Sequence, residues 1–264
     1  MEEYKLYKNR VILKFDSKSH IYSVKGKQVF GTTSIIGVLD KPALKYWAVN
    51  MAIGSLEKGL EPGVALDEIQ IKQLLEEARR AHTITKNKSA DIGTMIHKWV
   101  ENYIEARVAK KQIPKRPVNA EMKNAIEGFF NWAKENKVQI VASEQKVYHT
   151  RYKYAGTLDL EAIVNGKRTI VDLKTSNAIY PEMFLQAAAY LKAREQETGK
   201  KYPGGVMILR LSKENKEKKI EAFEAVKDTK VDEHFRCFLY CLGIYRWKMA
   251  MKKENIINKA NGIK

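Results

Sequence analysis

One short stretch, from Tyr154 to Thr175, constrains what this chain can fold into more than any other. It reads YAGTLDLEAIVNGKRTIVDLKT, with an apolar-rich segment on either side of Asn165-Gly166. An Asn-Gly pair in that setting is a strong signal for a β-hairpin with a two-residue type I′ turn. The turn fixes the register by placing residue 164 opposite residue 167. The sequence therefore predicts that Asp159 lies directly across the hairpin from Asp172.

The same register sorts the other side chains of the hairpin. Because side chains alternate along a strand, Lys174 projects on the same side as Asp172. The opposite side is then core, formed by Leu158, Leu160, Val171 and Leu173. Two carboxylates about 5 Å apart across a ladder repel each other and need a compensating cation. A solvated outer face, on which Asp and Lys have no chemical role, is the alternative.

A divalent metal is the natural cation for this pair of acids. Mg²⁺ and Mn²⁺ prefer carboxylate, carbonyl and water oxygens as ligands. A lysine beside such a metal can polarise or deprotonate an attacking water at neutral pH. The pattern is therefore typical of phosphodiester hydrolysis.

The charge of the chain indicates what it binds. Lys and Arg total 48 against 31 Asp and Glu, a formal net charge of +17. Such a balance favours a polyanionic partner such as nucleic acid, with a membrane surface as the weaker alternative. No apolar run approaches the ~18 residues that a spanning helix requires, and the start MEEYKLYKNR lacks a signal-peptide core. We expect a cytoplasmic protein, in a bacterium or a phage-infected host cell.

Local patterns predict the elements around the hairpin. Asn119 is a candidate helix cap, and Pro181 suits the first turn of a helix. The tail is expected to pack on the sheet and to fray beyond Lys252. The expected strands are 5–15, 20–30 with a turn at 25–27, 138–149, 204–211 and 216–226, and the expected helices are 42–60, 66–82, 84–110, 119–137, 181–198 and 228–259.

Several polar or aromatic residues have two readings. Thr33 and Ser34, between Gly31 and Gly37, are either an ordinary helix cap or a phosphate-binding segment. Trp47 is either core or a platform on which a base stacks. Arg151 and Lys153, at the tip of a strand, suit contacts to backbone phosphates, whereas Arg210 either reaches a phosphate or is solvated.

Three motifs together resemble a known family. They are Gly156-Thr157-Leu158-Asp159, Val171-Asp172-Leu173-Lys174, and the pair Gln186 and Tyr190 on the next helix. In order and spacing they resemble the PD-(D/E)XK nuclease superfamily, in particular its RecB-like exonuclease branch. The resemblance implies an α/β fold: a restriction-endonuclease-like core with a central mixed β-sheet flanked by helices, and a mainly helical amino-terminal elaboration.

The resemblance also implies roles for these residues. Asp159, Asp172 and the carbonyl of Leu173 would be metal ligands, and Lys174 would act on the attacking water. Gln186 and Tyr190 would position the lysine or the DNA strand. Many members carry glutamate where this chain has Asp172, but aspartate also binds metal.

Two further stretches extend the resemblance. Gly93-Thr94 with His97 and Glu101 resembles the histidine-bearing first motif of these nucleases, which implies that His97 is an additional metal ligand. Glu144 matches a strand glutamate near the metal site, although a salt bridge explains it equally well. The segment TTSIIGVLDKPALKYWA is similar to the amino-terminal region of phage and mitochondrial genome maintenance exonucleases, which favours DNA contacts by Thr33, Ser34 and Trp47.

The chain is expected to be one elaborated nuclease domain over residues 1–264. Residues 1–137 would form an amino-terminal hairpin and helical part, 138–226 the catalytic sheet core, and 227–264 a carboxyl-terminal helix. Mg²⁺ or Mn²⁺ is the expected cofactor. Related nucleases with an iron–sulfur cluster need four cysteines, and the chain has only Cys237 and Cys241, so no such cluster is expected.

The expected activity is that of a metal-dependent deoxyribonuclease. An exonuclease that leaves 5′-phosphates, in DNA recombination, repair or replication, is favoured because the matched branch is mostly exonucleolytic. The expected partners are single-stranded DNA or duplex ends and a single-strand annealing or replication protein, with no membrane. A structure-specific endonuclease of the same fold and a non-catalytic DNA-binding recombination mediator are the alternatives.

Overall fold

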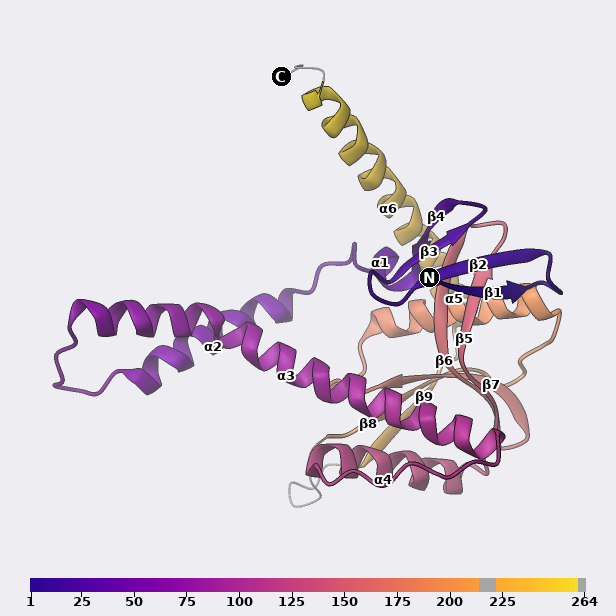
Figure 1. The fold of residues 1–264 in the computed structure, drawn as a ribbon, viewed down its shortest axis with the longest axis horizontal. Helices are drawn as coiled ribbons and strands as arrows, with labels where there is room; N and C mark the ends of the chain where they lie inside the picture. Colours follow the sequence, from indigo (N-terminus) through magenta and orange to yellow (C-terminus); the bar gives the residue numbers. More distant parts are fainter. Residues whose placement is uncertain (214–221, 261–264) are drawn as a thin grey trace. The chain divides into compact units, whose positions relative to one another are not determined.

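The computed structural model describes residues 1–213 and 222–260, with side chains to residue 254 in the last helix. The chain divides into two compact units. Unit 1 comprises Met1–Leu39 and Ile96–Lys264, and it contains the sheet (Figure 1). Unit 2 comprises Asp40–Met95 and is helical.

The described residues of unit 1 form a mixed sheet of nine strands. Its order is β1-β2-β3-β4-β6-β7-β8-β9, with β5 paired to β6 off this path. β6 is the centre, because it pairs with β4 in parallel and with β5 and β7 in antiparallel fashion. The strands are β1 (Glu2–Leu6), β2 (Val11–Asp16), β3 (Ile21–Val24), β4 (Lys27–Gly31), β5 (Gln139–His149), β6 (Tyr154–Val164), β7 (Lys167–Lys174), β8 (Gly205–Leu211) and β9 (Phe223–Lys227).

The predicted central hairpin is confirmed. Its ladder runs from Val164 opposite Lys167 to Leu160 opposite Val171. Asn165 has a φ of 46° and Gly166 a φ of 78°, and positive φ at both positions is what a type I′ turn requires. The turn chemistry therefore sets the register of β6 against β7.

The helices follow the predicted caps. Asn119 begins its helix, and its side chain accepts a hydrogen bond from the Met122 N–H at 3.0 Å. Pro181 stands in the first turn of its helix, and Gly199 closes that helix with a φ of 66°. The helices are α1 (Thr32–Ile36), α2 (Pro42–Gly59), α3 (Glu68–Val108), α4 (Ala120–Glu135), α5 (Pro181–Thr198) and α6 (Val231–Ala260).

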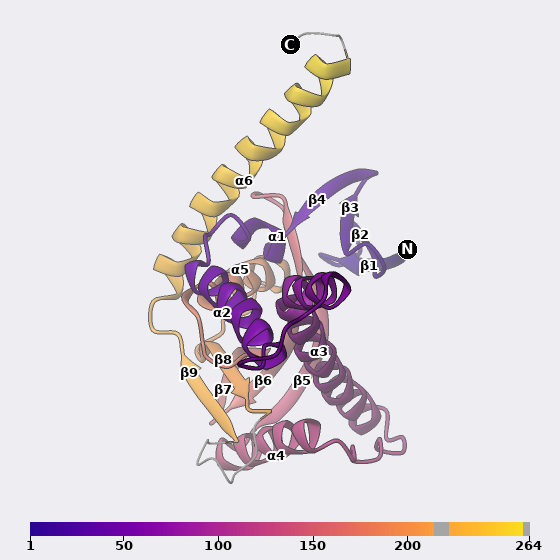
Figure 2. The same ribbon diagram turned by 90° about the vertical axis from the view of Figure 1, so that its left-hand side faces the viewer.

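The main core of unit 1 lies between the sheet and two helices, α5 and α6. Burial of each large aliphatic side chain contributes about 1.5–3 kcal/mol, so this layer fixes α5 over β6, β7 and β8. Helix α6 runs past the sheet, and its carboxyl-terminal half projects away from it (Figure 2). The shared buried residues include Leu158, Ile170, Leu185, Ala189, Ile208, Phe238 and Leu242.

A second layer of helices covers the other face of the sheet. Helix α4 lies against β8 and β9, where Asn124 donates a hydrogen bond to the Ser212 carbonyl at 2.9 Å. The end of α3 packs on α4 through rings, with Tyr103 5.0 Å from Phe130 between centroids. Trp99 stacks on Tyr103 at 5.6 Å. The sheet is therefore flanked by helices on both faces.

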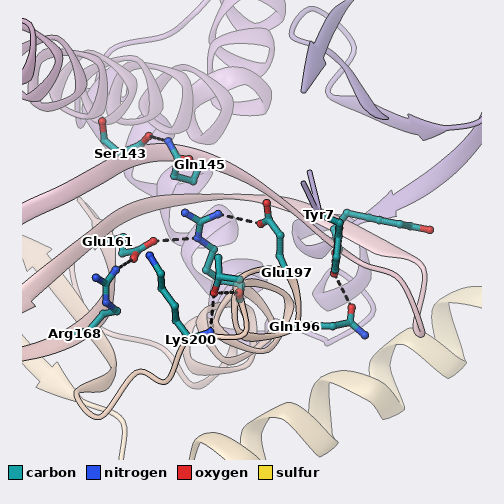
Figure 3. A network of polar contacts seen from close by, with 11 residues as sticks. Tyr7, Ser143, Gln145, Glu161, Arg168, Gln196, Glu197 and Lys200 are labelled. Atoms are coloured by element: carbon teal, nitrogen blue, oxygen red, sulfur yellow. Dashed lines mark hydrogen bonds and ion pairs between the residues drawn. The ribbon is translucent and has the colours of Figure 1, made fainter. Parts of the chain in front are cut away.

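A buried ion network ties the hairpin to α5 (Figure 3). Glu161 of β6 is 1% exposed and is held by two guanidinium groups. Arg168 of β7 donates to its Oε1, and Arg194 of α5 donates to its Oε2 at 3.0 Å. Arg194 also donates to Glu197 at 3.0 Å. Because a buried carboxylate is tolerated only while its partners satisfy it, the network holds β6, β7 and α5 together.

The strand predicted over residues 5–15 is wrong. The chain turns between β1 and β2, where Tyr7, Lys8 and Asn9 have φ values of 52°, 55° and 69°. Asn9 is a residue type that tolerates positive φ, but Tyr7 and Lys8 are not, so the sequence carries only a weak turn signal there. The 20–30 stretch is the hairpin of β3 and β4, and its predicted turn is confirmed by positive φ at Lys25 and Gly26.

Two other predictions need correction. The helices predicted at 66–82 and 84–110 are the single helix α3, because no proline or glycine interrupts residues 68–92. Helix α6 continues past Lys252 to Ala260, so no end is seen near Lys252.

The strand predicted at 216–226 is seen as β9 from Phe223, and residues 214–221 lie outside the described residues. In the described part of the chain no helix is long and apolar enough to cross a membrane.

The buried end of β5 predicts how stability depends on pH. His149 is 6% exposed, and its Nδ1 accepts a hydrogen bond from the Tyr152 N–H at 3.3 Å. Burial, helped by Arg151, lowers the pKa of His149 from 6.5 to about 4. Between these values the unfolded chain binds a proton that the folded chain excludes. Stability is therefore complete above pH 6.5 and falls as the pH drops towards 4, by about 1–3 kcal/mol.

Urea unfolding of His149→Phe across this pH range should show a flatter dependence of the unfolding free energy on pH than the wild type. The matched control is His20→Asn, at an exposed histidine whose positive φ asparagine tolerates. A His149→Phe profile as steep as the wild type would contradict this account.

Candidate active site

The hairpin ladder ends where the predicted acids begin. Its last pair is Leu160 opposite Val171, one residue short of Asp159 and Asp172. Beyond it, the carboxylate of Asp159 takes the place of a strand partner, because its Oδ2 accepts the Leu173 N–H at 2.7 Å. Asp172, the next residue in register, is 1% exposed. The two carboxylates thus lie at one end of the hairpin.

Asp172 and Lys174 form a buried ion pair. Lys174 Nζ lies 2.5 Å from Asp172 Oδ2. Burial raises the pKa of Asp172 and Asp159 acts in the same direction, while Lys174 opposes both. Burial alone would lower the pKa of Lys174, but Asp172 and Asp159 outweigh it and raise that pKa above its usual value. Lys174 is therefore an ammonium group that neutralises the acids beside it.

Glu144 lies beside Asp159 on the neighbouring strand. The ladder pairs Ser143–Leu160 and Gln145–Leu158 flank it, and its own φ is 50°, a conformation that costs a non-glycine residue energy. Burial, with a smaller effect of Asp159, raises the pKa of Glu144 to about 7. The third acid therefore stands next to the pair predicted from the hairpin.

Lys146 supplies the salt-bridge partner that was the alternative reading of Glu144. Its Nζ is 4.0 Å from Glu144 Oε2. The same ammonium lies over the rings of Tyr4 and Phe15, at 5.3 and 5.1 Å from their centroids. Strands β1 and β2 thus hold the ammonium group of Lys146 in place. Because this group pairs with Glu144, the two strands also influence the position of the Glu144 carboxylate. Nothing in the local sequence links residues 4 and 15 to residue 146.

His97 approaches the acids from α3. Its Nδ1 lies 3.8 Å from Asp159 Oδ1, both within unit 1. Glu101, one turn further along the helix, pairs instead with Lys98 at 2.7 Å. The geometry therefore brings His97, but not Glu101, against the carboxylate of Asp159.

Gln186 and Tyr190 connect Lys174 to the start of α1. Lys174 Nζ donates to Gln186 Oε1 at 3.3 Å. Gln186 Nε2 donates to Thr33 Oγ1 and to the Tyr190 hydroxyl, each at 2.9 Å. Thr32 Oγ1 donates to the same hydroxyl at 3.1 Å. A chain of hydrogen bonds thus runs from the amino-terminal segment to the lysine. Thr32 is the residue that sequence reasoning missed, although it lies in the stretch already singled out.

The donor atoms fit a hard divalent cation chemically. Carboxylate oxygens and a main-chain carbonyl are ligands that Mg²⁺ and Mn²⁺ prefer, and the imidazole of His97 would be the single nitrogen ligand. Asp172 Oδ2 is buried and accepts no hydrogen bond of ordinary geometry from the described residues; Lys174 alone is seen to compensate its charge. As they stand, no three His, Cys, Asp or Glu side chains in the described part of the chain are gathered closely enough to hold a metal ion. Metal binding would therefore require Lys174 to move off Asp172.

The residues expected to contact nucleic acid are placed in different settings. Thr33 and Ser34 are exposed at the start of α1, although Thr33 also accepts from Gln186. Arg151 lies over the Tyr152 ring at 5.3 Å, and Lys153 lies 6.0 Å from the Tyr148 ring centroid. The two remaining residues differ: Arg210 donates to Glu224 at 2.7 Å, and Trp47 is half-buried in unit 2.

Comparison with known proteins identifies the class of the chain. The sequence model described as the PD-(D/E)XK nuclease superfamily matches residues 71–247. No curated protein matches the chain. Among solved structures, a protein from Eubacterium rectale named as a candidate exonuclease is similar, with 13% identity over 66% of this chain and 69% of that one and a TM-score of 0.39. The structure of SSO0001 is also similar, with 14% identity over 74% and 84% of the two chains and a TM-score of 0.30.

Gly156 provides a test of how tightly the site is packed. A Cβ at this position would lie 2.5 Å from Tyr190 Cε1 and 2.9 Å from Thr32 Oγ1. Gly156→Ala should therefore displace Tyr190 and lower the free energy of unfolding by about 1–3 kcal/mol, as urea titration would measure. Gly243→Ala, in open space on α6, is the matched control and should be neutral or stabilising by up to about 1 kcal/mol. Equal effects at both sites would contradict the close approach of Tyr190.

Proposed function

The chain belongs to the PD-(D/E)XK nuclease superfamily, and we propose that it is a metal-dependent DNA exonuclease acting at the end of the β6–β7 hairpin. The observation that carries the proposal is the buried Asp172–Lys174 ion pair beside Asp159. A protein that only binds DNA gains nothing from buried acids that face a polyanion. A hydrolase needs them, because they bring a cation to the phosphate.

Asp159, Asp172 and the Leu173 carbonyl would hold Mg²⁺ or Mn²⁺, with His97 as a further ligand. Bound there, such an ion would supply stabilisation of the negative charge that develops on the phosphate oxygens, and it would make water a better nucleophile. Asp159 is held for this task by the Leu173 N–H, so one of its oxygens already has a fixed direction.

Lys174 would act on the attacking water as a hydrogen-bond donor. Because its pKa lies above the usual value, it enters the reaction as an ammonium group, and Gln186 aims it. Glu144, whose pKa is raised to about 7, is suited to accept the proton of that water near neutral pH. In-line attack by the water would expel the 3′-oxygen and leave a 5′-phosphate.

DNA is the proposed substrate. The net charge of +17 supplies the sequence-independent attraction to phosphates. Ser34, Arg151 and Lys153 are the side chains that we assign to backbone contacts. Action on single strands or duplex ends, in recombination, repair or replication and with an annealing or replication protein as partner, rests on the resemblance to the RecB-like branch.

A nuclease assay tests the proposal. Purified protein is incubated with end-labelled linear and closed circular DNA, single- and double-stranded, with Mg²⁺, Mn²⁺ or EDTA. We expect loss of linear DNA only, no activity in EDTA, and a fall of about 100-fold or more in Lys174→Ala. Lys192→Ala, a lysine on α5 that pairs with Asp232, should keep its activity. Cutting of circles would replace the exonuclease with an endonuclease, and DNA binding without cleavage under any metal would refute the enzyme.

Thr33 has two proposed roles that kinetics separate. If its hydroxyl positions Gln186 and through it Lys174, Thr33→Val should lower kcat by about 3- to 10-fold and leave KM for DNA unchanged, because one hydrogen bond is lost. Ser34→Ala, at the exposed neighbouring hydroxyl, is the comparison and should raise KM with kcat unchanged. A Thr33→Val enzyme with raised KM and normal kcat would show that Thr33 contacts DNA instead.

A further inference from the structure

Helix α2 of unit 2 has an apolar stripe whose members are mostly exposed. The stripe repeats every three and four residues, the spacing of a helix–helix seam. Three of its members on the helix are largely exposed: Tyr46 at 73%, Val49 at 57% and Ile53 at 48%. Leu56, which is half-buried, continues the stripe, and Leu60, 54% exposed, follows at the carboxyl cap.

The opposite side of α2 is already partly buried. Trp47, Met51 and Ser55 are half-buried there. At the end of the helix, a Cβ on Gly59 would meet Leu74 Cδ1 of α3 at 2.3 Å, so the two helices approach closely. Helix α2 is thus apolar on two sides, although none of its residues is fully buried. A helix that is apolar on both sides is typical of a buried position between two partners.

The charge of unit 2 indicates what kind of partner fits the stripe. Residues 40–95 contain eight basic and eight acidic residues and are neutral, so the +17 of the chain falls entirely on unit 1. A neutral apolar surface offers no electrostatic attraction to nucleic acid. It is also the part of this chain at which two copies can meet without the repulsion between their basic units.

We propose that the stripe Tyr46, Val49, Ile53 and Leu56 pairs with the same stripe of a second copy of this chain. A two-fold axis through the level of residue 51 lays two α2 helices antiparallel. It places Tyr46 opposite Leu56 of the second copy and Val49 opposite Ile53, so every large side chain of the stripe meets another. A self-complementary patch of this kind is what a symmetric dimer requires.

The same axis brings the two ends of the seam into a favourable arrangement of charge. Lys45, which pairs with Asp40 of its own chain at 2.9 Å, falls at the level of Glu57 of the second copy. The amino-terminal end of one helix also meets the carboxyl-terminal end of the other, which suits the helix dipoles. A parallel pairing would instead place Lys45 beside Lys45 and Glu57 beside Glu57. Both features therefore favour the antiparallel dimer.

Sedimentation velocity of the full chain over a range of concentrations tests the dimer. We expect concentration-dependent dimerisation of the wild type. Val49→Glu buries a carboxylate in the seam twice per dimer and should raise the dissociation constant at least ten-fold. Val118→Glu is the matched control, because Val118 is 98% exposed in unit 1 and lies outside the stripe; its dissociation constant should equal that of the wild type. Circular dichroism checks that both variants fold.

Four outcomes would overturn the proposal. The first is a wild type that stays monomeric at all concentrations. The second is a Val49→Glu protein that dimerises as well as the wild type. The third is a Val49→Glu protein that is less stable to heat than the wild type at a concentration where both are monomeric, which would show that the stripe packs within one chain. The fourth is a Val49→Glu protein that binds DNA more weakly but dimerises as the wild type does, which would show that the stripe contacts DNA.

Charge reversal tests the direction of the helices. Lys45→Glu and Glu57→Lys should each weaken dimerisation by about two- to five-fold, and the double variant should restore it. A double variant that dimerises no better than either single variant would contradict the antiparallel pairing.

Discussion

The register fixed by the Asn165-Gly166 turn is the constraint on which the candidate site depends. A slip of one residue in β7 would turn every side chain to the opposite face. Asp172 and Lys174 would then leave the side of Asp159, and Val171 and Leu173 would lose the core. The positive φ values at Asn165 and Gly166 select one pairing, and the ladder carries it to Leu160 and Val171. The buried Glu161 network holds that pairing against α5.

The register places Asp172 in a buried position, and the neighbouring residues of the site compensate its charge. Asp172 is almost completely buried, so its charge needs a cation nearby. Lys174 fills that need in the structure, and Gln186 links it to Thr33 of α1. The amino-terminal segment is thus connected, through Gln186, to the lysine that the hairpin presents. A metal ion and Lys174 would compete for the charge of Asp172, and Gln186 is the hydrogen-bond partner that would remain to the lysine once it left Asp172.

Local chemistry made much of this fold predictable. The turn, the Asn119 cap and the helix that begins at Pro181 each depend on neighbours in sequence, and all three are confirmed. The turn at Tyr7, Lys8 and Asn9 was missed, because Tyr7 and Lys8 have positive φ, which their residue types do not favour. Thr32 with Tyr190, and Lys146 with Tyr4, are contacts between distant segments, and no local pattern encodes them.

Binding of Mn²⁺ to the whole protein, followed by isothermal titration calorimetry without DNA, tests the central claim most directly. The account predicts that the wild type binds Mn²⁺ and that Asp159→Asn and Asp172→Asn each abolish the binding heat. Asp232→Asn, at an exposed acid on α6, should bind as the wild type does. Mn²⁺ binding that survives both Asp159→Asn and Asp172→Asn would contradict a metal site at the end of this hairpin.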